Sequence, residues 1–184
     1  MIIGITGTNG AGKGTVVDYL VHTKGCNHFS ARAFITEEIK RQGLPIDRPH
    51  MRQVANELRQ MHGPAYVIEQ LLEQAKITPG VSVIESVRTI GEAKLLLAHG
   101  AQLWAVDAER KIRYERIRTR MNETDQVTFE QFCEYEDREM QGTEPWDMNV
   151  FGVMQLAHHT FFNNTTRDAL FAQVEQVWEN RPIS

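Results

Sequence analysis

The chain has 184 residues, of which 20 are Lys or Arg and 24 are Asp or Glu, so its formal net charge is −4. This length fits one domain, and the weak acidic charge argues against a general partnership with nucleic acid or a membrane surface. No apolar stretch could span a bilayer, and a core strand expected from residue 2 leaves no room for a signal peptide. Cys26 and Cys133 lie far apart without metal-ligand spacing, so a reducing, cytoplasmic location is expected.

The first predicted element is a short apolar strand over residues 2–5, which has the composition of a buried parallel strand. It leads into the glycine-rich segment Gly7-Thr8-Asn9-Gly10-Ala11-Gly12-Lys13-Gly14-Thr15, and an amphipathic stretch over residues 16–21 follows. A strand, a glycine-rich turn and a helix N-terminus are the context in which such a loop binds phosphate. Backbone N–H groups and the helix dipole attract phosphate oxygens, and Lys13 adds a full charge for the β- and γ-phosphates. The segment therefore predicts a nucleoside triphosphate ligand.

Strands and helices alternate along the rest of the chain. Residues 25–29 read as a weaker strand, residues 54–72 as helix interrupted near Gly63-Pro64, and residues 81–84 as a second buried strand. Apolar residues at 93, 96 and 97 predict a helix, strands are expected at 103–106 and 157–162, and a last helix begins near residues 165–168. This alternation predicts an α/β fold with a doubly wound, five-stranded parallel sheet. Ligands of such sheets bind outside the carboxyl ends of the strands.

Residues 108–148 break the alternation, because they contain no strand pattern and are densely charged. Basic residues crowd the first part and acidic residues the second. One interpretation is a pair of solvated helices whose opposite charges pair. The preferred interpretation is a helical lid with some of the basic side chains facing phosphate, because the segment directly follows a core strand at the expected ligand edge.

The glycine-rich segment resembles the loop of adenylate kinase and its nucleoside monophosphate kinase relatives. Most other loops of this class carry Ser or Thr directly after the lysine, where the hydroxyl ligates magnesium, whereas Gly14 stands there in this chain. The resemblance implies a P-loop NTPase fold with ATP as the donor. It further implies that Mg²⁺ is held mostly by water and by the nucleotide, without a direct protein ligand. The residues implied to hold the ATP phosphates are Thr8, Asn9, Gly10, Ala11, Gly12, Lys13, Gly14 and Thr15.

Glu85-Ser86-Val87-Arg88, which follows the strand at 81–84, resembles the Asp-x-x-Arg segment of monophosphate kinases. In this chain Glu replaces Asp and no glycine follows it. The resemblance implies that Glu85 acts on magnesium through water and that Arg88 grips the acceptor phosphate. The same resemblance assigns an acceptor-binding region to about residues 31–76. Its implied contacts are Ser30, Arg32, Arg52, Asn56 and Arg59, with Arg48 on the same segment; the alternative is that the arginines at 48, 52 and 59 form one basic surface face.

Residues 103–120 resemble the strand and lid of dephospho-CoA kinases and monophosphate kinases. The resemblance implies that Arg116 and Arg120 meet the charge that develops on the transferred phosphoryl group. Either Asn163 or Asn164 matches the asparagine of the last strand-to-helix turn near the donor base, and Asn164 is the one chosen. Residues 132–140, with their Asp-Arg-Glu sequence, resemble a group of archaeal dephospho-CoA-kinase-like and nucleotide-kinase-like proteins.

The function expected is phosphate transfer from ATP to a nucleoside or deoxynucleoside monophosphate. Catalysis would rest on positioning and charge neutralisation by Lys13, Arg88, Arg116 and Arg120. If the acceptor were a hydroxyl, Glu85 and then Asp107 would be the candidate general bases. Two other functions stay open, namely a dephospho-CoA kinase, whose loop normally reads Lys-Ser-Thr, and a nucleotide-binding switch or assembly factor with slow ATP hydrolysis. The expected partner is a nucleotide-like small molecule; its base and sugar, ATP against GTP, and the oligomeric state are open.

Overall fold

The computed structural model describes residues 1–119 and 127–181. Within these residues, five strands form one parallel sheet in the order β2-β3-β1-β4-β5. They are β1 (Ile2–Gly7), β2 (Asn27–Ser30), β3 (Ser82–Glu85), β4 (Gln102–Asp107) and β5 (His159–Phe162). The predicted doubly wound parallel sheet is therefore confirmed, with the phosphate-loop strand β1 at its centre.

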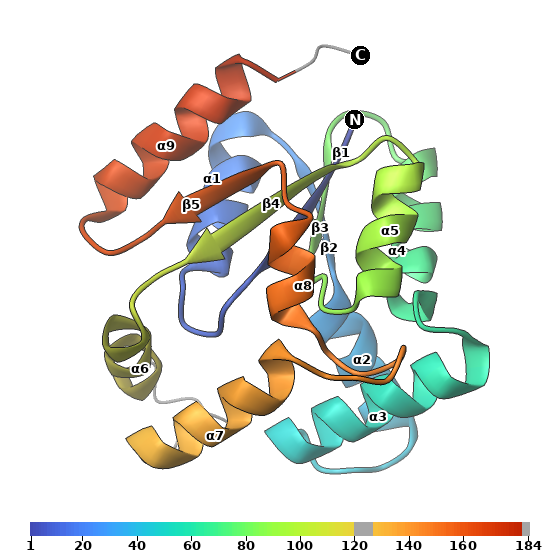
Figure 1. Ribbon diagram of the computed structural model, residues 1–184. Helices are drawn as coiled ribbons and strands as arrows, with labels where there is room; N and C mark the ends of the chain where they lie inside the picture. The colour runs from blue at the N-terminus through green and yellow to red at the C-terminus, as the bar shows by residue number, and fades with distance from the viewer. Residues whose placement is uncertain (120–126, 182–184) are drawn as a thin grey trace.

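Helices cover both faces of the sheet (Figure 1). One face carries α1 (Lys13–Lys24) and α9 (Arg167–Glu179), and the other carries α4 (Tyr66–Ile77) and α5 (Ile90–Ala98). Along each strand, alternate side chains enter separate cores: Ile3, Ile5 and Trp104 pack towards α1 and α9, whereas Ile84 and Leu103 pack towards α4 and α5. Because both faces are covered, the strands are apolar in continuous runs rather than at alternate positions.

The two helices that follow β2 begin at residues whose side chains accept hydrogen bonds from N–H groups of the first turn. Ser30 Oγ accepts a hydrogen bond from Ala33 N at the start of α2 (Ala31–Arg41), and Asp47 Oδ1 accepts one from His50 N at the start of α3 (Arg48–His62). As predicted, Gly63-Pro64 separates α3 from α4. Neither α2 nor the short α8 (Val150–Gln155) is anticipated by the sequence analysis.

Two strands begin two residues later than predicted. Gly25 is the left-handed cap of α1, with φ 69°, and its N–H bonds to carbonyls of the last turn, so β2 begins at Asn27 rather than at residue 25. The last strand begins at His159 rather than at 157. The charged segment contains α6 (Arg110–Thr119) and α7 (Phe129–Met140), which lie at the same end of the molecule as α2 and α3 (Figure 1). None of the described helices is long and apolar enough to cross a membrane.

A buried ion pair joins α3 to the start of α5. Arg59 is 2% exposed and donates Nε and Nη2 to Oε1 of Glu92, at 2.9 and 2.7 Å. Oε2 of Glu92, which is fully buried, accepts the backbone N–H groups of Arg88 and Thr89 at 2.8 and 3.0 Å. Glu92 thereby closes a capping box with Thr89 and fixes the turn after β3. Helix α3 and the turn after β3 thus share one buried carboxylate.

We expect Glu92→Gln to lower the free energy of unfolding by about 3 kcal/mol or more, because it leaves the buried Arg59 guanidinium without its counter-charge. Glu73→Gln, which removes a solvent-exposed pair with Lys76 on α4, is the matched control and should change stability by less than about 1 kcal/mol. Urea unfolding of both variants checks this, and equal midpoints for the two would contradict it.

Candidate functional site

One cavity of about 940 Å³ lies at the carboxyl ends of β1 and β3. The glycine-rich loop forms one wall, from Asn9 to Thr15, and the turn after β3 forms another with Glu85, Ser86 and Arg88. Helices α2 and α3 and the end of α7 close the far side. The volume is at the upper end of the range for small-molecule sites, which is large enough for two substrates side by side.

Two carbonyl oxygens of the glycine-rich loop accept hydrogen bonds from side chains that lie outside the loop. Asn9 O accepts a hydrogen bond from Arg113 Nη1 at 3.2 Å, and Ala11 O accepts one from Asn163 Nδ2 at 2.8 Å. In a trans peptide the C=O of one residue and the N–H of the next point in opposite directions. The N–H groups of Gly10 and Gly12, two residues that line the cavity, therefore point away from these outer contacts. This arrangement presents donors to an anion in the cavity.

Close packing explains why the loop needs glycine at these two positions. A Cβ on Gly10 would lie 2.6 Å from Arg113 O, and a Cβ on Gly12 would lie 2.4 Å from Asn163 Nδ2. Both glycines also have positive φ, 80° and 101°. The loop is thus pressed between α6 and the turn after β5, and a side chain at either position would push it away from these supports.

Lys13 and Thr8 are bound to the base of the same loop. Lys13 Nζ donates to Gly7 O at 3.0 Å and to Thr8 O at 2.8 Å, while the side chain lines the cavity. Thr8 Oγ1 donates to Asp107 Oδ1 at 2.7 Å, and that oxygen also accepts the Ala108 N–H. Asp107, the second candidate base, is therefore engaged in fixing the loop to the end of β4.

Glu85 lies in the cavity and is paired with a residue that sequence reasoning missed. Its Oε2 is 3.0 Å from His28 Nε2, on the neighbouring strand β2. Burial raises the pKa of the Glu85 carboxyl. The hydrogen bond and charge of His28 lower that pKa, the charges of Lys13 and Arg88 lower it further, and the net pKa lies below its ordinary value. Glu85 is consequently an ionised carboxylate in the cavity near neutral pH.

Ser86 follows Glu85 at the position where monophosphate kinases carry a glycine after the acidic residue. Its backbone adopts a conformation that is usual for glycine. Its φ is 74°, the left-handed region that non-glycine residues rarely adopt. Ser86 N and Val87 N both donate to Ile5 O, which fixes this turn to β1. Strained residues of this kind gather at ligand sites because the surrounding structure must hold them.

Five arginines line the cavity, namely Arg32, Arg48, Arg52, Arg59 and Arg88. Arg32 and Arg52 are exposed and have no acidic partner among the described residues. Arg48 and Arg88 both donate to the carboxylate of Glu139 on α7, at 2.6 and 3.3 Å. The cavity lining also includes the apolar side chains of Ile35, Ile46, Met51 and Ala55.

The remaining predicted contacts are placed as follows. Ser30 caps α2, Asn56 Nδ2 donates to Asp147 Oδ1 at 3.2 Å, and Arg59 is the buried partner of Glu92. Asn164 Oδ1 accepts the Glu109 N–H at 2.7 Å, so it caps the start of α6, whereas Asn163 is the asparagine that touches the loop. Arg116 Nη2 donates to Asn163 O at 2.8 Å. Arg120 lies outside the described residues.

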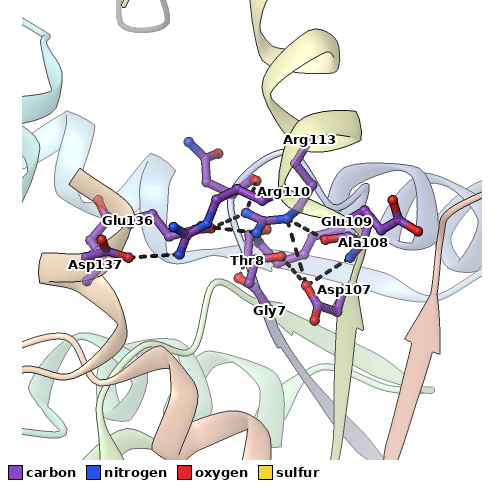
Figure 2. Close-up of polar contacts among 12 residues, drawn as sticks. Gly7, Thr8, Asp107, Ala108, Glu109, Arg110, Arg113, Glu136 and Asp137 are labelled. Atoms are coloured by element: carbon purple, nitrogen blue, oxygen red, sulfur yellow. Dashed lines mark hydrogen bonds and ion pairs between the residues drawn. The ribbon is translucent and has the colours of Figure 1, made fainter. Parts of the chain in front are cut away.

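Opposite charges on α6 and α7 pair, as the first interpretation of this segment proposed. Arg113, 5% exposed, binds both oxygens of Glu136, and Arg110 Nε adds a third bond to Glu136 at 2.7 Å (Figure 2). Arg110 also donates to Asp137 at 2.8 Å. Arg113, the more buried of the two arginines, also binds backbone oxygens. Its Nε donates to Ala108 O at 2.6 Å, and its Nη1 donates to Asn9 O in the phosphate loop. The buried pair therefore connects α7 to the phosphate loop.

The arrangement fits ATP and magnesium in different ways. The inward donors and Lys13 suit a chain of phosphates. Within residues 1–119 and 127–181, no group of three or more His, Cys, Asp or Glu side chains could hold a metal ion directly. If magnesium arrived with the nucleotide, Glu85 is the carboxylate of the same cavity that would hold it through water. That ion would supply charge neutralisation to the phosphates.

Several residues of the site were missed because they act across long sequence separations. His28 belongs to no motif, and the resemblance of residues 132–140, which include Glu136 and Glu139, assigned no role to either side chain. Glu92 had an available signal, since Thr89-Ile90-Gly91-Glu92 is a Thr-x-x-Glu capping pattern ahead of an apolar run. Nothing in the sequence indicates that Arg59 is its partner.

We expect Arg113→Gln to weaken binding of Mg²⁺–ATP by about tenfold, the equivalent of one charge-assisted hydrogen bond to the loop. Arg110→Gln is the matched control, because Arg110 binds the same Glu136 from the solvent side without touching the loop. Titration calorimetry measures both affinities, and thermal unfolding confirms that both variants are folded. An equal loss of affinity in the two would mean that the arginines only hold α7.

Comparisons with known proteins show the family to which the chain belongs. Residues 3–142 match the family model described as AAA domain. Curated relatives include a UPF0200 protein of Methanococcus vannielii, which is 28% identical over 91% of this chain and 89% of its own length. A UPF0200 protein of Staphylothermus marinus is 30% identical over 76% of this chain and 74% of its own length.

Solved structures show the same fold. TT1252 from Thermus thermophilus superposes with a TM-score of 0.63 at 18% identity over 99% of this chain and 98% of its own. The shikimate kinase from Acinetobacter baumannii in complex with shikimate superposes with a TM-score of 0.58 at 17% identity, over 98% of this chain and 94% of its own. The chain has a kinase-like P-loop fold and belongs to the AAA domain family and to the UPF0200 proteins.

Proposed function

We propose that this protein is an ATP-dependent phosphotransferase whose acceptor is a nucleoside or deoxynucleoside monophosphate. The observation that carries the proposal is the composition of the cavity at the phosphate loop. The loop forms one wall, and arginines and apolar side chains from α2, α3 and the turns beside them line the rest. Guanidinium groups bind phosphate bidentately, and apolar side chains suit the flat face of a base.

In the proposed reaction the loop amides and Lys13 hold the β- and γ-phosphates of ATP. Arg88 and Arg32 hold the acceptor phosphate in line with the γ-phosphate, and Arg116 approaches the transferred group. Arg120 is a further candidate from the sequence for this last role. Each side chain acts by position and charge, which is the main demand of phosphoryl transfer. A cytoplasmic location and a nucleotide-like partner are part of the same proposal.

The state of Glu85 favours a phosphate acceptor over a hydroxyl acceptor. A hydroxyl must lose a proton, so an enzyme that uses one gains from a base whose pKa is near the working pH. The pKa of Glu85 is instead lowered by His28 and by the charges of Lys13 and Arg88, which makes it a weak base. A phosphate oxygen is already ionised and needs no base. Glu85 then serves as a fixed negative charge for the water ligands of magnesium.

We expect Lys13→Ala to keep its fold and to lose at least about a hundredfold in turnover, the scale of removing one key electrostatic contact. Lys76→Ala, an exposed lysine of α4 paired only with Glu73 in the described residues, is the control and should be unchanged. ADP release with Mg²⁺–ATP and the active acceptor measures turnover, and circular dichroism checks folding. Normal turnover in folded Lys13→Ala would remove the lysine from the mechanism.

A second prediction separates the kinase from its rivals. Arg88→Lys keeps the charge but loses the planar fork, so kcat/KM for the acceptor should fall at least about tenfold while ATP affinity stays within about twofold of wild type. Arg41→Lys, at the exposed end of α2, controls for the chemical change. The measurement is steady-state kinetics across a panel of monophosphates and dephospho-CoA, with separate ATP titrations.

The wild-type panel decides the class of acceptor. Turnover with dephospho-CoA alone would identify the dephospho-CoA kinase alternative. Tight ATP binding without stimulation by any acceptor would identify a switch or assembly factor. If no monophosphate stimulates ADP release, the proposed acceptor is wrong.

A further inference from the structure

A carboxylate of the protein itself binds two arginines on the acceptor side of the cavity. Oε1 of Glu139, near the end of α7, accepts Nη2 and Nε of Arg48 at 2.6 and 3.2 Å. Oε2 accepts Nη1 of Arg88 at 3.3 Å. The three side chains are between 12% and 24% exposed and all line the cavity. An anion between two guanidinium groups is the arrangement expected of a bound carboxylate or phosphate ligand.

The neighbouring acids of α7 bind elsewhere. Glu134 pairs with Arg138 on the same helix, Glu136 with α6, and Asp137 with Arg110. Of the acidic side chains of α7, Glu139 is the one in the cavity wall. It also reaches two different elements, α3 through Arg48 and the turn after β3 through Arg88. Its position is therefore separate from the charge pairing that joins α6 and α7.

We propose that Arg48 and Arg88 form the binding site for an anionic group of the acceptor, a phosphate, and that Glu139 is an internal ligand which fills this site when the acceptor is absent. The proposal rests on the proposed function, because it takes the acceptor to be a phosphate compound bound at Arg88. It adds Arg48 as an acceptor-binding residue. It also makes the end of α7 leave the two arginines when the acceptor binds.

Two features favour a displaceable ligand over a permanent bridge. The Arg88 contact, at 3.3 Å, is long for a charge-assisted bond, for which about 2.8 Å is usual, so the arginine that would hold the acceptor is the less firmly bound of the two. The acceptor side is also rich in positive charge, since Arg32 and Arg52 add to the same wall without acidic partners among the described residues. A phosphate dianion that replaced Glu139 would meet more donors than the carboxylate uses.

An internal ligand has a distinctive thermodynamic effect. It reduces the fraction of molecules with an open site, so it raises the apparent Kd of every competing anion by the same factor. A carboxylate that instead stayed beside the bound anion would repel it, and would weaken a dianion more than a monoanion. The ratio of two anion affinities therefore distinguishes displacement from repulsion.

The test uses the full chain with its loop occupied by a non-hydrolysable ATP analogue and Mg²⁺, so that added anions report only the acceptor side. Inorganic phosphate and acetate are titrated into wild type, Glu139→Gln and Glu134→Gln, and the ¹⁵Nε signals of Arg48 and Arg88 are followed by NMR. Glu134→Gln removes the same charge from the exposed face of α7 and is the matched control. Glu139→Asp is a second variant, which keeps the charge but shortens the reach to both arginines.

We expect Glu139→Gln to bind phosphate about tenfold more tightly than wild type, as if the open fraction rose from about one in ten to nearly all molecules. Acetate affinity should rise by the same factor, Glu139→Asp should show a smaller rise, and Glu134→Gln should match wild type. Unchanged or weaker phosphate binding in folded Glu139→Gln and Glu139→Asp would overturn the inference, and a larger gain for phosphate than for acetate would replace displacement by repulsion. Failure of the ATP analogue to bind at all would count against the proposed function instead.

Discussion

The site depends on which way the peptide groups of one loop are turned. A nine-residue loop has as many carbonyls as amides, and an anion binds only if the carbonyls are occupied elsewhere. In this protein Arg113 and Asn163 take two of them from outside, and Lys13 takes two more at the base of the loop. Neither outer donor belongs to the loop. Anion binding by the glycine-rich segment is therefore a property of its packing against α6 and the turn after β5, as well as of its glycines.

The arginine-lined side of the cavity depends on a second buried group, the Glu92 carboxylate. One oxygen holds Arg59 of α3, and the other holds the backbone of the turn that carries Arg88. Separating the two charges would leave each of them buried without its partner, so the pair holds both elements in one arrangement. Glu139 connects the same turn to α7, and Glu136 on that helix connects through Arg113 to the phosphate loop. Helix α7 is thus tied both to the turn after β3 and, through Arg113, to the phosphate loop.

The parts that could be predicted are those written in contiguous residues. Short-range patterns indicate the loop, its flanking strand and helix, and the alternation of apolar runs. From these patterns the parallel sheet could be predicted, and so could the position of the cavity at the carboxyl ends of its strands. The partners of the charged side chains could not be predicted, because Arg113 meets Asn9 across 104 positions and Arg59 meets Glu92 across 33. Helix α2 had a usable signal in Ala31, Ile35 and Ile39 at four-residue spacing, whereas α8 is too short for a helical period to appear.

The central place of β1 has a consequence for how the protein folds. This strand pairs with β3, whose residues follow it by 80 positions, and with β4, which follows by about 100. To form these two parallel pairings, the chain must close large loops and lose conformational entropy before the strand contacts stabilise it. Folding is therefore expected to be slow for a chain of this length. The loop that binds phosphate begins where this strand ends, so it takes shape only when the middle of the sheet has assembled. A nascent chain that ends before β4 has no binding site, and recovery of nucleotide binding during refolding would report assembly of the whole sheet rather than of its first seven residues.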